Sequence, residues 1–183
     1  MKRIILPFLC LLAIWARSIQ AQEVPFENEV KRISAKYDSL GWSPGGIVFT
    51  GSSTIRMWSS LEETFSVENL INTGFGGSKA SDLEQHLFPL VIKFEPSRVF
   101  IYEGDNDLWA NVEVASILSS LDNIVTRIHL IFPNTEIFLI GAKPSPSRWE
   151  KRANYPIVNQ MLSEYGQAKE NVEFVDVCQA LTN

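Results

Sequence analysis

Five short runs of hydrophobic residues, rich in β-branched and aromatic side chains, recur along the chain. They cover residues 47–50, 67–72, 99–102, 137–140 and 172–177. The runs are largely unbroken, which is typical of strands that are covered on both faces of a parallel sheet. The pattern therefore predicts five buried strands.

Longer stretches with hydrophobic residues at helical spacing lie before and between these runs. They cover residues 24–40, 53–65, 79–93, 112–132 and 153–165. Strands and helices that alternate at these lengths favour right-handed βαβ units around one parallel sheet. Since no repeat, low-complexity tract or charge run divides the chain, we expect a single α/β domain.

Four turns rich in glycine, proline and polar residues directly follow predicted strands. They are residues 51–54, 74–77, 103–107 and 143–147. In an open parallel sheet, ligands bind beyond the carboxyl ends of the strands. The chemistry of this protein is therefore expected in these turns.

The first turn places Ser52 and Ser53 where a strand changes into a helix. A serine such as Ser53 can be an N-cap, whose hydroxyl satisfies a free backbone N–H. It can instead be a nucleophile beside backbone amides that stabilise negative charge, provided that a base removes its proton. This segment alone leaves both interpretations open.

The second turn contains Gly74, Gly76 and Gly77, and the third contains Asp105, Asn106 and Asp107. The glycine spacing lacks the last glycine of a dinucleotide fingerprint and the Gly-Lys-Ser order of a P-loop, so it argues against nucleotide binding. The remaining interpretations of these glycines are a tight turn and a backbone amide that donates to an oxyanion. The acidic residues invite a calcium interpretation but lack the spacing of a calcium loop. An asparagine that donates to an oxyanion is the alternative.

Taken together, the three turns resemble the first three sequence blocks of the SGNH/GDSL hydrolases. The matching segments are residues 49–58, 72–78 and 102–108, in the order of the family. The two serines and the following Ile-Arg-x-Trp are similar to the branch of platelet-activating-factor acetylhydrolase-like esterases and carbohydrate esterases. The resemblance implies a three-layer α/β/α sandwich with a flavodoxin-like, five-stranded parallel sheet.

The resemblance also implies residue roles. Ser53 corresponds to the nucleophile, and the oxyanion hole would comprise the backbone N–H groups of Ser53 and Gly77 with the side-chain amide of Asn106. Arg148 and Trp149 fall where family members line the substrate pocket. The implied reaction hydrolyses a carboxylic ester through an acyl-enzyme at Ser53, without a metal or cofactor. The expected substrate carries a short acyl group, such as acetyl, on a carbohydrate or small lipid.

The last block of the family, Asp-x-x-His, has no counterpart before the sequence ends at Asn183. Its histidine is the base for the serine, and its aspartate orients the histidine. The histidines that are present, His86 and His129, lie in helical stretches rather than after strands. Two interpretations remain open. Residues 22–183 are the SGNH domain of a longer esterase without its last segment, or the chain is a non-catalytic relative that keeps the cleft for binding.

The first 21 residues have the order of a signal peptide. Lys2 and Arg3 precede the apolar run 4–15, and Ala21 offers a small residue for cleavage. An uncleaved anchor is the alternative, although the run is short for a bilayer. After cleavage Cys178 would be the only cysteine, so we expect a bacterial secreted or periplasmic protein without a disulfide. No later stretch is expected to span a membrane.

The formal net charge is −5, and the basic leader makes the rest of the chain more acidic still. Nucleic-acid binding needs clustered lysine and arginine, so this balance argues against it. The expected partner is a small-molecule or carbohydrate ester.

Overall fold

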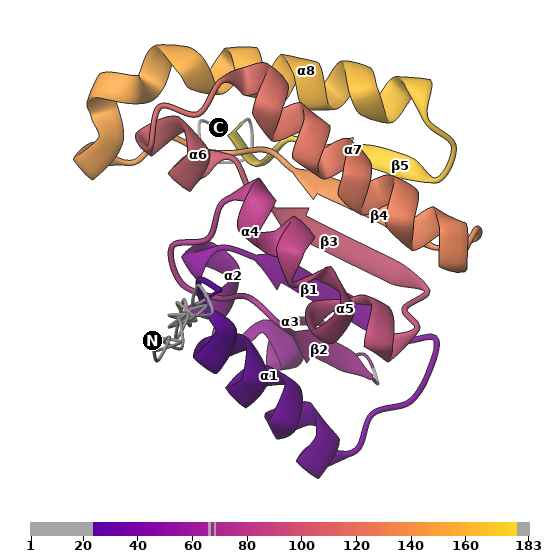
Figure 1. Ribbon diagram of the computed structural model, residues 1–183. Coiled ribbons are helices and arrows are strands. Elements are labelled where there is room, and N and C mark those ends of the chain that lie inside the picture. Colours follow the sequence, from indigo (N-terminus) through magenta and orange to yellow (C-terminus); the bar gives the residue numbers. More distant parts are fainter. Residues whose placement is uncertain (1–23, 66, 68, 179–183) are drawn as a thin grey trace, which may run out of the picture.

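The computed structural model describes residues 24–65, 67 and 69–178, which form an all-parallel sheet with helices on both faces (Figure 1). The predicted leader lies outside these residues. The strand order is β2-β1-β3-β4-β5, which confirms the α/β class and the flavodoxin-like sheet. The strands are β1 (Ile47–Gly51), β2 (Leu70–Asn72), β3 (Arg98–Tyr102), β4 (Glu136–Ile140) and β5 (Val172–Val175).

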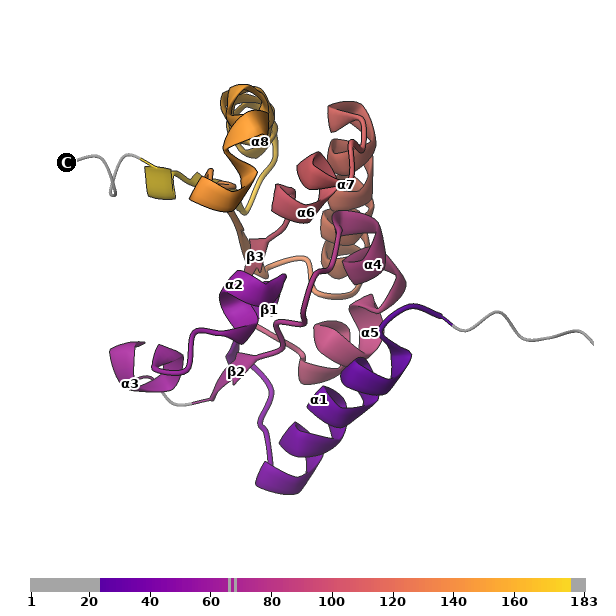
Figure 2. The same cartoon turned by 90° about the vertical axis from the view of Figure 1, so that its left-hand side faces the viewer.

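Helices cover the two faces of the sheet unequally (Figure 2). The connection from β1 to β2 crosses the sheet in the opposite direction from the later connections. Right-handed crossovers therefore place its helices on the opposite face. That face carries the short helices α2 (Ser53–Arg56) and α3 (Leu61–Phe65). The other face carries α1 (Glu27–Leu40), α4 (Ala80–Gln85), α5 (Leu87–Leu90), α7 (Val114–Ile131) and α8 (Tyr155–Ala168).

Alternate residues of the central strands point to the two faces. Val48 belongs to the larger core, which lies between the sheet and the helices α1, α4, α5, α7 and α8. Its neighbour Phe49 belongs to a smaller cluster with residues of α2 and α3. The ring of Phe49 stacks on Phe100, and Phe100 stacks on Phe138, with centroids 4.4 and 4.5 Å apart. Such cross-strand aromatic pairs stabilise the sheet and fix its register.

Several predicted elements are shorter than expected, and the causes are local. The predicted helix 79–93 divides into α4, α5 and a 3-10 turn (Ile92–Phe94). Pro89 has no N–H, and its ring would collide with the carbonyl of Gln85, where α4 ends. Strand β2 begins only at Leu70, because Asn69 adopts a left-handed φ of 58°. The predicted helix 53–65 likewise divides into α2 and α3.

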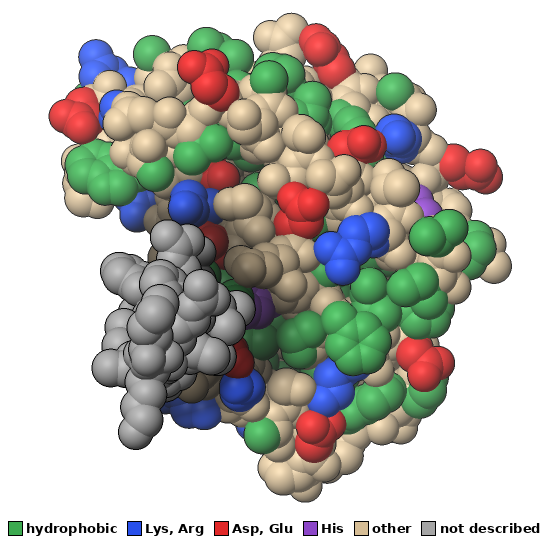
Figure 3. All heavy atoms as spheres, in the orientation of Figure 1, with side chains coloured by type: hydrophobic (Ala, Val, Ile, Leu, Met, Phe, Trp, Pro, Cys, Tyr) green, Lys and Arg blue, Asp and Glu red, His purple; other side chains and the backbone are tan. Residues whose placement is uncertain are grey.

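By length and composition alone, helix α7 is long and apolar enough to cross a membrane. Its buried residues nevertheless belong to the core over the sheet, as in a central helix of a globular domain. Figure 3 shows the face that carries α7, where acidic and basic side chains are interspersed. Hydrophobic side chains gather there over α5, the helix with the exposed Phe88. The buried residues of α7 are Ile117, Leu121, Ile124, Val125 and Ile128.

Candidate functional site

The turns after β1, β2 and β3 meet at the carboxyl edge of the sheet, as the sequence predicts. Gly51 pairs with Tyr102 in the parallel register. The backbone N–H of Ser52 donates to the carbonyl of Tyr102 at 3.0 Å, and that of Phe75 donates to the carbonyl of Gly51 at 2.9 Å. A Cβ on Gly51, whose φ is +115°, would lie 2.1 Å from the Tyr102 oxygen. Glycine is therefore required where the two strands converge.

Ser53 is the first residue of α2, and it is half-buried. The N-cap is Ser52, whose backbone is extended and whose side chain makes no capping hydrogen bond. The N-cap interpretation of Ser53 is therefore wrong. Within the part of the chain that the structure describes, neither the hydroxyl nor the backbone N–H of Ser53 is engaged in a hydrogen bond. Both groups remain available to a ligand.

Helix α1 holds the glycine turn after β2. The Tyr37 hydroxyl accepts a hydrogen bond from the Asn72 N–H at 2.8 Å and donates to the Asn72 carbonyl at 3.0 Å. The Glu29 carboxylate accepts from the Gly76 N–H at 3.2 Å. The guanidinium of Arg56, one turn after Ser53, donates to the same carboxylate at 3.2 Å. These contacts fix the turn that leads into Gly77.

Gly77 itself is exposed and adopts a left-handed φ of +77°. Its backbone N–H has no acceptor among residues 24–65, 67 and 69–178. The space beside its Cα is open, because an added Cβ would meet nothing within 4 Å. The amide of Gly77 is therefore free to donate to a bound group, as the resemblance requires.

Asn106 is buried in the short helix α6 (Asp105–Trp109), which follows β3. Its Nδ2 donates to the carbonyl of Ser78 at 2.8 Å. Its Oδ1 accepts a hydrogen bond from the guanidinium of Arg148 at 2.7 Å. An amide NH2 has two donors, so one N–H of Asn106 stays uncommitted. The structure thus joins Asn106 directly to the glycine turn.

The acidic residues on either side of Asn106 have separate partners. Asp105 accepts a hydrogen bond from the Tyr155 hydroxyl and pairs with Arg148, each at 2.6 Å. Asp107 accepts hydrogen bonds from the backbone N–H groups of Ala80 and Gly104, each at 3.2 Å. Because the two carboxylates do not converge on one point, the calcium interpretation is not supported. Both residues order the turn instead.

Arg148 and Trp149, which the resemblance implies as pocket residues, lie in different surroundings. They belong to a 3-10 segment (Pro146–Asn154) before α8. The Arg148 guanidinium is held by Asn106 and Asp105. Trp149 is 57% exposed, and the guanidinium of Arg152 lies 5.2 Å from the centre of its ring. The structure therefore brings Arg148, but not Trp149, into contact with Asn106.

Both histidines bond to backbone oxygens. His86 Nε2 lies 2.6 Å from the carbonyl of Pro25, and His129 Nε2 lies 3.0 Å from that of Thr135. His86 is buried against the ring of Phe75, with ring centroids 6.3 Å apart. These contacts give each histidine a structural role, in keeping with their helical positions in the sequence.

Glu103 is a buried acid that the sequence did not explain. Its Oε1 accepts a hydrogen bond from the Ser78 hydroxyl at 2.7 Å, whereas Oε2 is buried without a partner among the described residues. Burial raises the pKa of Glu103 well above its ordinary value. Burial also raises the pKa of Asp107 to about 6, although the N–H groups of Ala80 and Gly104 oppose this rise. The neutral forms of both acids are therefore favoured by folding.

The raised pKa values of Glu103 and Asp107 predict that these two groups make the fold less stable as the pH rises above about 4, where carboxyl groups ionise in the unfolded chain. The folded state binds more protons than the unfolded state in that range, so the free energy of unfolding falls with pH. Glu103→Gln keeps the acceptor for Ser78 and removes the ionisation. It is therefore expected to reduce the fall in the free energy of unfolding between pH 5 and pH 8. Urea denaturation across this pH range measures the effect, with the exposed Glu170→Gln as the control. A fall identical to that of the unsubstituted chain would contradict the assignment.

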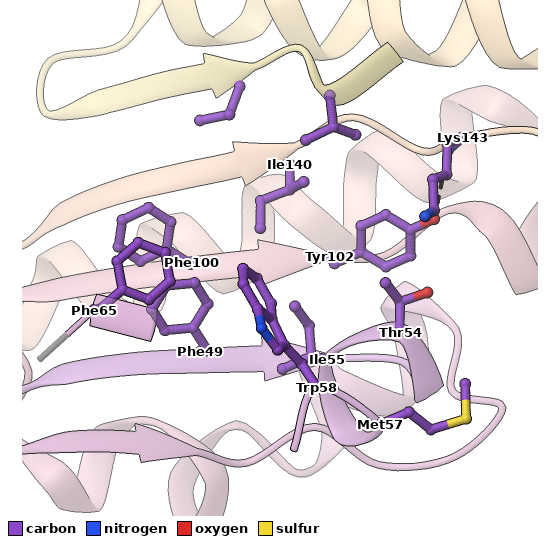
Figure 4. A pocket seen from close by; sticks show the side chains of 12 residues that line it. Phe49, Thr54, Ile55, Met57, Trp58, Phe65, Phe100, Tyr102, Ile140 and Lys143 are labelled. Carbon is purple, nitrogen blue, oxygen red and sulfur yellow. Dashed lines mark hydrogen bonds between the residues drawn. The ribbon is translucent and has the colours of Figure 1, made fainter. Parts of the chain in front are cut away.

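An apolar hollow of about 630 Å³ lies on the face of the sheet that carries α2 and α3. Figure 4 shows the stacked rings of Phe49 and Phe100 along its floor. Thr54, Tyr102 and Lys143 stand at the end to which the strands point. The hollow therefore reaches the carboxyl edge of the sheet next to Ser53.

Comparison with known proteins gives the family. The family model for GDSL-like lipases and acylhydrolases matches residues 38–183. The chain belongs to this family. None of the curated proteins compared with this chain matches it. Family membership and fold together indicate an ester hydrolase.

Several solved structures share the fold. A Streptococcus pneumoniae protein described as a candidate platelet activating factor is 25% identical, with a TM-score of 0.73 over 85% of this chain and 78% of that chain. A GDSL-like lipase from Bacteroides thetaiotaomicron is 20% identical, with a TM-score of 0.71 over 82% and 78% of the two chains. The acetylxylan esterase Axe2 from Geobacillus stearothermophilus is 18% identical, with a TM-score of 0.52 over 73% and 77%. The fold inferred from the three turns is thus found in these proteins.

Proposed function

We propose that this protein hydrolyses carboxylic esters of short acyl groups, such as acetyl groups on a carbohydrate or small lipid, with Ser53 as the nucleophile. One observation carries the proposal. The amide of Asn106 is fixed by two partners and keeps one N–H free, beside a glycine turn whose Gly77 N–H is also free. Donors held in place before the reaction are the main means of stabilising an oxyanion.

In the proposed reaction, the Ser53 hydroxyl loses its proton to a base and attacks the ester carbonyl. The carbonyl oxygen becomes an oxyanion, which accepts hydrogen bonds from Asn106 Nδ2 and from the N–H groups of Gly77 and Ser53. Collapse of this intermediate expels the alcohol and leaves an acyl group on Ser53. Water then attacks the acyl-enzyme and releases the acid.

The alternative is a binding protein that keeps the cleft without catalysis. The positions of the histidines favour this alternative. In the described ranges, His86 and His129 each bond to a backbone carbonyl, and neither is assigned as the base. A triad enzyme without its base retains a rate of only about 10³–10⁴ over water. The two functions therefore differ by a rate that is easily measured.

The test is a series of p-nitrophenyl esters from acetate to octanoate, assayed with the protein as its gene encodes it. We expect release of p-nitrophenol above the buffer rate, with the highest kcat/KM for acetate. Acetylated xylan, chosen because an acetylxylan esterase shares the fold, tests the carbohydrate part of the proposal. A preference for octanoate would overturn the short-acyl assignment and implicate the apolar hollow. No turnover of any ester, together with saturable binding of one of them, would favour the binding protein.

A further inference from the structure

Arg148 is the charged side chain that contacts the proposed oxyanion amide. It lies 42 residues beyond Asn106 in the sequence, yet its Nη2 donates to Asn106 Oδ1 at 2.7 Å. Its Nη1 lies 2.6 Å from Asp105 Oδ2. The Arg148 side chain is only 24% exposed, and its guanidinium lies 5.8 Å from the centre of the Trp109 ring. Three neighbouring residues of α6 thus hold one guanidinium.

These contacts determine which way the Asn106 amide faces. A guanidinium can only donate hydrogen bonds, and a backbone carbonyl can only accept them. The Oδ1 of Asn106 faces the guanidinium of Arg148, and its Nδ2 faces the carbonyl of Ser78. Rotation of the amide by half a turn would oppose donor to donor and acceptor to acceptor. Arg148 and Ser78 therefore select the same orientation from opposite sides.

Arg148 is itself fixed through the core. Asp105, its ionic partner, accepts a hydrogen bond from the hydroxyl of Tyr155 at 2.6 Å. Tyr155 is 1% exposed and packs in the large core cluster at the start of α8. By contrast, the segment Pro146–Asn154 that carries Arg148 has no buried residue. The position of the guanidinium thus depends on the chain of contacts from Tyr155 through Asp105.

We propose that Arg148 is a positioning residue for ester hydrolysis, which holds the Asn106 amide in the orientation that donates to the oxyanion. The inference rests on the proposed role of Asn106. A hydrogen bond from a charged donor also draws electron density from the amide, which strengthens the remaining N–H as a donor. Since the oxyanion is absent from the bound ester and its charge develops only as Ser53 attacks, the contribution belongs to kcat rather than to KM.

The kinetic test compares Arg148→Met with Arg152→Met, a matched change in the same segment. Arg152 contacts Trp149 and, among the described residues, does not contact Asn106. We expect Arg148→Met to lower kcat for p-nitrophenyl acetate about tenfold, with KM within about twofold. Arg148→Lys should recover part of the loss, because lysine still donates one hydrogen bond. A rise in KM with an unchanged kcat would overturn the proposal and assign Arg148 to substrate binding.

A charge-balanced variant separates positioning from the loss of an ion pair. Arg148→Met leaves the Asp105 carboxylate without its cationic partner. The double variant Arg148→Met with Asp105→Asn removes both charges and leaves none unpaired. If Arg148 acts through Asn106, both variants lose the same fraction of kcat. Recovery of kcat in the double variant would show that the unpaired charge caused the defect, and would overturn the proposal.

A spectroscopic test does not depend on turnover. The side-chain NH2 resonances of Asn106 are assigned by their loss in Asn106→Asp in a ¹H–¹⁵N correlation spectrum. In Arg148→Met we expect these resonances to shift and their hydrogen exchange to accelerate, whereas Arg152→Met leaves them unchanged. Unaltered resonances in Arg148→Met would overturn the positioning role. If the unsubstituted protein hydrolyses no ester, the proposed function fails, but this measurement still decides what Arg148 does to the amide.

Discussion

Replacing Ser53 with alanine is expected to lower kcat/KM for p-nitrophenyl acetate by at least about 10³-fold. Ser53 is half-buried at the start of α2, and its hydroxyl has no protein partner within the described ranges. Without it no acyl-enzyme forms, and the oxyanion donors can assist only direct attack by water. The measurement is initial rates over a range of ester concentrations, with intact mass spectrometry to detect an acyl group on the protein.

The adjacent serine provides the control. Ser52 lies in the same turn as Ser53, but it is only 2% exposed, and its side chain makes no capping hydrogen bond. Ser52→Ala is therefore expected to change kcat/KM by less than about twofold, because it removes no interaction with the ester. If Ser52→Ala abolished turnover and Ser53→Ala did not, the nucleophile would be misassigned.

Replacing Asn106 with alanine is expected to lower kcat by about 10²–10³-fold, the usual effect of removing one oxyanion donor. KM should change little, since the donor acts on charge that develops in the transition state. Asn106→Asp should not rescue the rate, because an ionised carboxylate has no N–H and would repel the oxyanion. Steady-state kinetics on both variants measure these effects.

The interpretation of the Asn106 variants needs a control for stability. Loss of the hydrogen bonds to Ser78 and Arg148 is expected to destabilise the fold by about 1–3 kcal/mol. Assays should therefore be made well below the unfolding temperature of each variant. Asn123→Ala removes an exposed amide that bonds Glu84 on the surface, and it should leave kcat unchanged. A fall in kcat that merely follows the fraction of unfolded protein would contradict the role of Asn106.

Local patterns in the sequence were sufficient to predict most of the fold. Each of the five apolar runs overlaps a strand, and their parallel order brings the three turns to one edge. The predictions were less accurate at the ends of elements. Hydrophobic periodicity continues through 79–93, but the ring of Pro89 divides the helix after Gln85. A periodic pattern indicates which face of a helix is buried, but it does not indicate whether the helix is continuous.

The candidate site was predicted in part. Ser53, Gly77 and Asn106 were identified because their turns resemble a family in order and spacing. The role of Glu103 was missed, because its partner Ser78 lies 25 residues earlier and no local pattern connects them. Arg148 was predicted as a pocket residue from the resemblance, and the structure adds that its guanidinium donates to Asn106.

The sequence by itself determined the parallel sheet, the edge at which the candidate site lies and the identity of the residues in the three turns. Strand formation and turn geometry depend on neighbouring residues, so local composition is enough to specify them. Only the tertiary structure decided that Ser52 and not Ser53 is the N-cap, that the acids beside Asn106 diverge, and that Arg148 holds the amide. Those outcomes depend on directional hydrogen bonds between distant segments, whose directions exist only after the sheet and helices have packed.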